Sequence, residues 1–192
     1  SGWDNGNNTS YLNTSVDAGA RDKYTKILGN GRDEVTLMIY LCGTDLESRS
    51  KMATSDIQEM IAADIADNVN VIVYTGGCKS WQNNAFSSKT NQIWQVTDKG
   101  VTCLEDNLGS KSMTDENTLA SFIKWSAKKF PANRNMLVMW DHGGGSVSGF
   151  GYDEKFASSG SMDLAEIDTA LKNGGVKLDF VGFDACLMAT AE

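Results

Sequence analysis

The chain has 192 residues, of which 41% are hydrophobic and 22% are charged, so it is long enough to form one globular domain with a substantial core. Its formal net charge is -8 at pH 7, and the lack of a basic stripe argues against binding to the phosphates of a nucleic acid. No stretch approaches the roughly 20 consecutive apolar residues that span a membrane, and the N-terminus shows no charged-then-apolar targeting pattern.

The beginning of the chain differs in composition from the rest. Residues 1–30 are rich in Asn, Ser, Thr, Asp and Gly and show little periodicity, which predicts a linker or a loosely attached arm. Residues 31–192 form the predicted folded domain, and order is expected to begin at the apolar run 35–41.

Short apolar runs that end at glycine or polar residues predict the strands of this domain. Four core strands and one small hairpin are expected. The core strands are 35–41, 70–75, 135–140 and 178–183, and the hairpin strands are 92–96 and 101–104.

Apolar residues at helical spacing predict three helices between these strands, and polar composition predicts loops at 43–49 and 78–92. The first helix contains Met52, Ile57, Met60, Ile61 and Ile65; the second spans 114–130, with Thr114 or Asp115 as its cap; the third spans 163–173 and stops at Gly174-Gly175. Alternation of strands and helices predicts an α/β fold with a mostly parallel sheet and helices on both faces. Ligands bind to such sheets outside the carboxyl ends of the strands.

Two chemically reactive side chains follow predicted core strands. His142, the only histidine, comes directly after 135–140, and Cys186 follows 178–183, 44 residues later. Because the carboxyl ends of parallel strands meet at one edge of a sheet, the thiol and the imidazole can approach each other as a nucleophile and its base. A structural interpretation stays open, since an isolated cysteine often fills a core and an isolated histidine often serves a structural purpose.

The glycines that follow His142 admit other interpretations. His-Gly-Gly-Gly at 142–145 is also the oxyanion loop of lipase-like esterases, although this chain lacks the downstream G-x-S-x-G and later histidine of that fold. A phosphate loop is disfavoured because neither G-x-x-x-x-G-K nor G-x-G-x-x-G is present. A doubly wound binding domain without catalysis is a further alternative. The four cysteines form no C-x-x-C pair and there is one histidine, so no metal site is predicted.

The two strand-end motifs carry a specific resemblance. A strand ending in Asp-His-Gly-Gly-Gly and a later one ending in Phe-Asp-Ala-Cys-Leu-Met resemble the clostripain family of cysteine peptidases, relatives of caspases and gingipains, over about residues 35–192. The resemblance implies a caspase-like three-layer sandwich and an endopeptidase that cleaves after Arg or Lys through a thioester. It makes Cys186 the nucleophile, His142 the general base and acid, and the amides of Gly143 and Cys186 the oxyanion hole. No third orienting group is required in this clan, so a structural role is expected for Asp141.

The resemblance also implies a specificity pocket and a mode of activation. Asp184 matches the acidic residue that pairs with the cationic substrate side chain, although it could instead cap the following turn. Family members are often zymogens that cut themselves after a basic residue between the histidine and the cysteine. Of the three lysines in that interval, Lys155 lies in a Gly- and Ser-rich segment that is expected to be flexible, so Lys155–Phe156 is the predicted activation bond.

The family sheet continues beyond its nucleophile, so a C-terminal chain or segment is expected to complete both the sheet and the specificity pocket. The expected partners are peptides or proteins with Arg or Lys before the scissile bond. No cofactor is expected to be required. The resemblance implies a role for calcium only in so far as some relatives depend on it. Many relatives are exported bacterial enzymes, so a secreted or cell-envelope location is expected.

Overall fold

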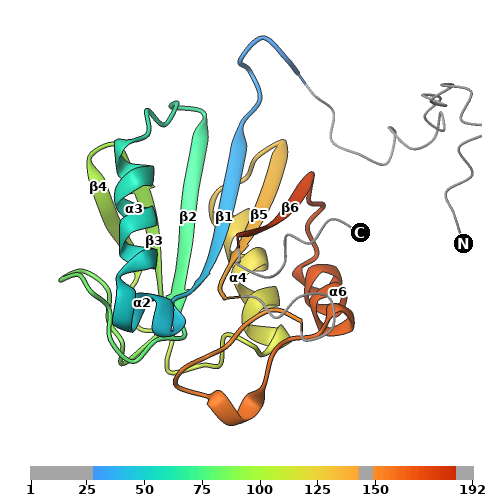
Figure 1. The fold of residues 1–192 in the computed structure, drawn as a ribbon. Coiled ribbons are helices and arrows are strands. Elements are labelled where there is room, and N and C mark those ends of the chain that lie inside the picture. The colour runs from blue at the N-terminus through green and yellow to red at the C-terminus, as the bar shows by residue number, and fades with distance from the viewer. Residues whose placement is uncertain (1–27, 143–148, 185–192) are drawn as a thin grey trace, which may run out of the picture.

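The computed structural model describes residues 28–142 and 149–184, which form a six-stranded sheet in the order β4-β3-β2-β1-β5-β6 (Figure 1). β2, β1, β5 and β6 are parallel, whereas β3 and β4 form an antiparallel hairpin at one edge. The strands are β1 (Val35–Cys42), β2 (Val69–Gly76), β3 (Gln92–Thr97), β4 (Gly100–Glu105), β5 (Arg134–Trp140) and β6 (Phe180–Asp184).

Helices cover both faces of this sheet. Side chains alternate along β1, so Met38 and Tyr40 pack under α4 and α6, while Ile39 and Leu41 pack on the side of α3. Two apolar cores result, one on each face, which confirms the three-layer α/β sandwich. The helices are α2 (Thr44–Ser50), α3 (Met52–Ala62), α4 (Glu116–Lys129) and α6 (Leu164–Gly174), with a short 3-10 helix, η1 (Ala157–Ser159).

The helix ends agree with the local sequence signals. Asp115 caps α4 by accepting a hydrogen bond from the amide of Asn117. Asp163 and Glu166 form a reciprocal capping box at the start of α6, and Gly175 ends that helix in the left-handed conformation. An N-cap of this kind contributes about 1 kcal/mol, so these ends are defined by local chemistry.

The prediction of a loop at 43–49 is wrong, because this stretch forms α2. The helix has seven residues and contains a single large apolar side chain, Leu46, so no hydrophobic periodicity reveals it. Its buried Glu47 instead accepts hydrogen bonds from the amides of Thr54 (2.8 Å) and Gln82 (2.7 Å). Lys51, in the left-handed conformation, separates α2 from α3.

The segment 78–92 is more buried than its polar composition predicts. Trp81 and Phe86 are both buried and meet edge to face, with ring centroids 5.2 Å apart. Phe86 also contacts Trp94 of β3, at 5.0 Å between centroids. Isolated aromatic residues produce no periodic pattern in the sequence, although each one buries a large apolar area and so stabilises the core strongly.

The sheet edge beyond β5 is less covered than its centre. β6 begins at Phe180, two residues later than predicted, and Phe180 is 52% exposed. Residues 1–27 of the predicted arm lie outside the described residues, so the domain boundary near residue 30 stays a prediction. Among the described residues, no helix is both long and apolar enough to cross a bilayer.

Candidate active site

The carboxyl ends of β1, β5 and β6 lie side by side, and the candidate residues follow them. In the strand register, Leu41 is paired with Trp140, and Trp140 is paired with Asp184. The amide of Asp141 continues this pairing by donating to the carbonyl of Asp184 at 3.3 Å. His142 therefore emerges two residues beyond β5, next to the end of β6.

His142 makes a close contact that the sequence analysis missed. Its Nε2 lies 2.6 Å from Oδ1 of Asp45, in the first turn of α2. The two side chains are 36% and 31% exposed, so the contact lies at the rim of the sheet edge. The more exposed Arg49, one turn along α2, lies 3.9 Å from the other oxygen of Asp45. Because Asp45 follows β1 as His142 follows β5, the strand-end argument used for the histidine could have found it.

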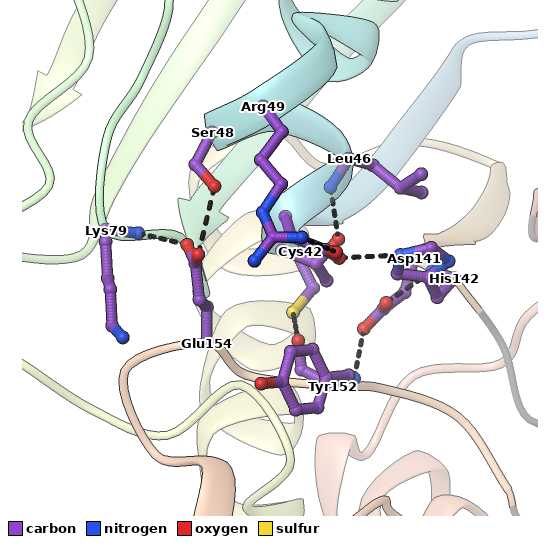
Figure 2. A network of polar contacts seen from close by, with 11 residues as sticks. Cys42, Leu46, Ser48, Arg49, Lys79, Asp141, His142, Tyr152 and Glu154 are labelled. Carbon is purple, nitrogen blue, oxygen red and sulfur yellow. Dashed lines mark hydrogen bonds and ion pairs between the residues drawn. The ribbon is translucent and has the colours of Figure 1, made fainter.

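Asp141 holds the backbone around His142. One carboxyl oxygen accepts from the amide of His142, and the other accepts from the amide of Tyr152 at 2.7 Å (Figure 2). Burial raises the pKa of Asp141 to about 7, against the opposing effect of these hydrogen bonds. The neighbouring Cys42 is fully buried, and its thiol donates to the carbonyl of Tyr152 at 3.6 Å. These contacts agree with the expected structural role of Asp141.

Asp184, the last residue of β6, borders a second acidic side chain. Partial burial, and then the charge of Asp56, raise the pKa of Asp184 above its usual value. Asp56 belongs to α3 and accepts from the indole of Trp140 at 2.6 Å. Two carboxyl groups therefore lie near the tryptophan at the end of β5.

The segment that contains the predicted activation bond is anchored, which corrects the expectation of a flexible loop. Glu154 accepts from the hydroxyl of Ser48 (3.0 Å) and the amide of Lys79 (2.7 Å) (Figure 2). Its own amide donates to the carbonyl of Gly77 (2.9 Å). The ammonium group of Lys155 donates to the carbonyl of Ser88 at 2.7 Å. Acidic side chains that accept from distant amides leave no signal in local composition, so the sequence did not reveal this anchoring.

Gly143 and Cys186, the remaining predicted site residues, lie outside the described residues. Cys42, Cys78 and Cys103 are free thiols, the first two buried and the third exposed. Within 28–142 and 149–184, no group of three His, Cys, Asp or Glu side chains is arranged to hold a metal ion.

Comparison with solved structures shows the same fold in cysteine proteases. A secreted C11 cysteine protease from Bacteroides thetaiotaomicron, in complex with an irreversible peptide inhibitor, is 21% identical with a TM-score of 0.59, over 82% of this chain and 44% of that one. A second structure of a secreted C11 protease from that organism, iotapain, is 16% identical with a TM-score of 0.61, over 82% and 47%. An inactive zymogen C11 protease from Parabacteroides distasonis is 24% identical with a TM-score of 0.58, over 80% and 42%. The chain thus spans less than half the length of these structures.

A second comparison uses sequence rather than structure. No curated protein matches the chain. The model of the Clostripain family, however, matches residues 39–192, which include both strand-end motifs and most of the domain. The chain therefore belongs to the clostripain family of cysteine peptidases.

Proposed function

We propose that this chain carries the catalytic core of a cysteine endopeptidase that cleaves peptide bonds after Arg or Lys, with Cys186 and His142 as its dyad. One observation carries the proposal: Trp140 and Asp184 are paired on adjacent parallel strands. His142 follows the first by two residues, and Cys186 follows the second by two. Neighbouring strands are about 4.8 Å apart, so the strand ends that precede these two residues in the sequence lie side by side.

The chemistry proceeds through a thioester. The imidazole of His142 takes the proton of the Cys186 thiol, and the sulfur attacks the scissile carbonyl carbon. His142 then gives that proton to the leaving amine, and water attacks the thioester to release the acid. The amides of Gly143 and Cys186 stabilise the negative oxygen of each tetrahedral intermediate, where loss of one donor costs about 3–4 kcal/mol.

Asp184 is the proposed partner of the cationic substrate side chain. Its proximity to Asp56 supports this role, because two carboxyl groups near one strand end favour a guanidinium or ammonium group. When the bound substrate excludes water from such a pair, removal of one partner costs about 2–5 kcal/mol. The sequence of the site does not favour Arg over Lys.

Activation is proposed to require cleavage of Lys155–Phe156. Membership of the family and the inactive zymogen form of the Parabacteroides distasonis protease support this proposal. Because the side chain and amide of Lys155 are both bonded in the intact chain, the segment must detach before a protease can bind it in an extended form.

Three further proposals concern the surroundings of the enzyme. A C-terminal segment or chain completes the sheet beyond β6, in agreement with the greater length of the solved relatives. Export from the cell is proposed because those relatives are secreted. The proposed chemistry of the dyad requires no cofactor. The family resemblance alone suggests a role for calcium.

Covalent labelling tests the proposed function. The full chain is incubated with a chloromethyl ketone that carries Lys or Arg, and its intact mass is measured. We expect one adduct in the wild type and in Cys103→Ala, which removes an exposed free thiol, and none in Cys186→Ala. An adduct that persists in Cys186→Ala would contradict the proposal. A serine-directed phosphonate adduct would instead support the esterase, and the absence of any adduct would support a binding domain.

A further inference from the structure

We propose that Asp45 is a positioning residue for His142, which holds the imidazole through Nε2 and leaves Nδ1 as the nitrogen that acts as the base. The inference rests on the proposed function for the base itself, but it adds a third residue to the dyad. It also assigns a role to α2, the helix that the sequence did not predict.

The contact itself determines which nitrogen is free. The Nε2 and Oδ1 atoms are 2.6 Å apart, within hydrogen-bond distance. An ionised carboxylate can only accept a hydrogen bond, so Nε2 must carry the proton that is shared with Asp45. In the neutral ring the lone pair then lies on Nδ1. Asp45 therefore selects the tautomer as well as the orientation of the ring, as acidic partners of histidine do in metal sites.

The backbone before Asp45 is held in place by β2. The amide of Gly43 donates to the carbonyl of Gly76 at 2.9 Å, and the amide of Thr44 donates to that of Gly77 at 3.2 Å. Thr44 is fully buried and has a φ of 54°, a left-handed conformation that is strained for a β-branched residue. Such strain persists only where the surroundings determine the conformation, so the position of Asp45 is fixed by the fold.

His142 is thus held at two points. Asp141 holds its backbone amide, and Asp45 holds the far end of its ring. Both partners of the Asp45 contact are partly exposed, and exposed ion pairs contribute only about 0–1 kcal/mol to stability. Removing Asp45 should therefore impair the geometry of the base far more than it destabilises the fold.

Steady-state kinetics on the full chain test this role. Asp45→Ala is expected to lower kcat about 10- to 100-fold, the range found for residues that hydrogen-bond to metal-binding histidines, with KM changed less than about twofold. Asp45→Asn should lie between Asp45→Ala and the wild type, because its amide oxygen can still accept from Nε2. Asp168→Ala is the matched control, since it removes another helical carboxylate from an i,i+4 pair, far along the chain on α6. A kcat within twofold of the wild type in a folded Asp45→Ala would overturn the inference.

A second measurement does not depend on activity. Because the chain has a single histidine, nitrogen NMR of the imidazole reports on His142 alone. We expect a proton on Nε2 that exchanges slowly with water in the wild type and in Asp168→Ala, and its loss in Asp45→Ala. A wild-type ring protonated only on Nδ1 would overturn the inference. A wild type that shows the expected Nε2 proton without peptidase activity would refute the proposed function while leaving the Asp45 contact standing.

Discussion

Carboxyl groups that follow the ends of the strands differ in their burial and in the groups that they contact. Asp45 is partly exposed and contacts the histidine ring, whereas Asp141 is buried and accepts hydrogen bonds from the backbone amides of His142 and Tyr152. Both lie at the same edge of the sheet, so proximity to His142 alone does not distinguish them. Their contacts do, and the two residues should therefore respond differently to substitution.

Asp141 should make the stability of the folded chain depend on pH. Its folded pKa of about 7 lies above the ordinary value of 3.8, so the folded state keeps a proton that the unfolded state releases between these values. The free energy of unfolding should therefore fall as pH rises from about 4 through about 7, by at most about 1.4 kcal/mol per pH unit.

Urea unfolding of the wild type and Asp141→Asn across this range measures that dependence. In Asp141→Asn the free energy of unfolding should fall less steeply with pH than in the wild type, whatever the absolute stability of the variant. Asp168→Asn, which alters an exposed carboxyl group, should keep the pH dependence of the wild type. Equal slopes in the wild type and Asp141→Asn would show that the carboxyl group does not retain its proton on folding.

At the scale of elements, α2 contacts both His142 and the segment that contains Lys155. It contributes Asp45 to His142 and Ser48 to Glu154, next to the predicted activation bond (Figure 2). The segment around Lys155 is thereby attached to the same helix that contacts the imidazole of His142. Detachment of this segment is the step that should limit cleavage.

Loosening this attachment should speed self-processing. Glu154→Ala removes the bonds to Ser48 and to the amide of Lys79, so the segment detaches more readily and cleavage after Lys155 should be several-fold faster. Splitting of the full-length band on a gel gives the rate. Lys155→Ala should abolish this splitting, and Lys172→Ala, which alters a lysine within α6, should leave it unchanged. Splitting that continues in Lys155→Ala would place the activation bond elsewhere.

The elements differ in how far the sequence predicted them. β1 and β2 were predicted by apolar runs, and α6 by its helically spaced apolar residues and the glycines that end it. α2 was missed because its structure depends on buried Glu47 rather than on apolar periodicity. The sequence also placed His142 at the carboxyl end of a core strand, because the residue closely follows the apolar run that forms β5. The same strand-end argument could have indicated Asp45, but the contact of Glu154 with Ser48 joins residues about 100 positions apart and leaves no signal in local sequence.

For the whole molecule, the fold agrees with membership of the family, and the described candidate residues gather at one end of the parallel strands. The carboxyl ends of β1, β5 and β6 bring together His142, its partner Asp45 and the acidic Asp184. The opposite strand ends provide structural contacts, such as that of Asp179 with the amide of Asn135 at 2.9 Å. The candidate residues therefore lie where ligands bind to other parallel sheets, outside the carboxyl ends of the strands.

The central claim is that one imidazole and one thiol meet at this edge. A crystal structure of the full chain after processing measures the separation between Nδ1 of His142 and Sγ of Cys186 directly. The account predicts about 3 to 4 Å, within hydrogen-bond reach for a thiol. A separation too wide for even one bridging water, in a form of the protein that cleaves substrate, would contradict it.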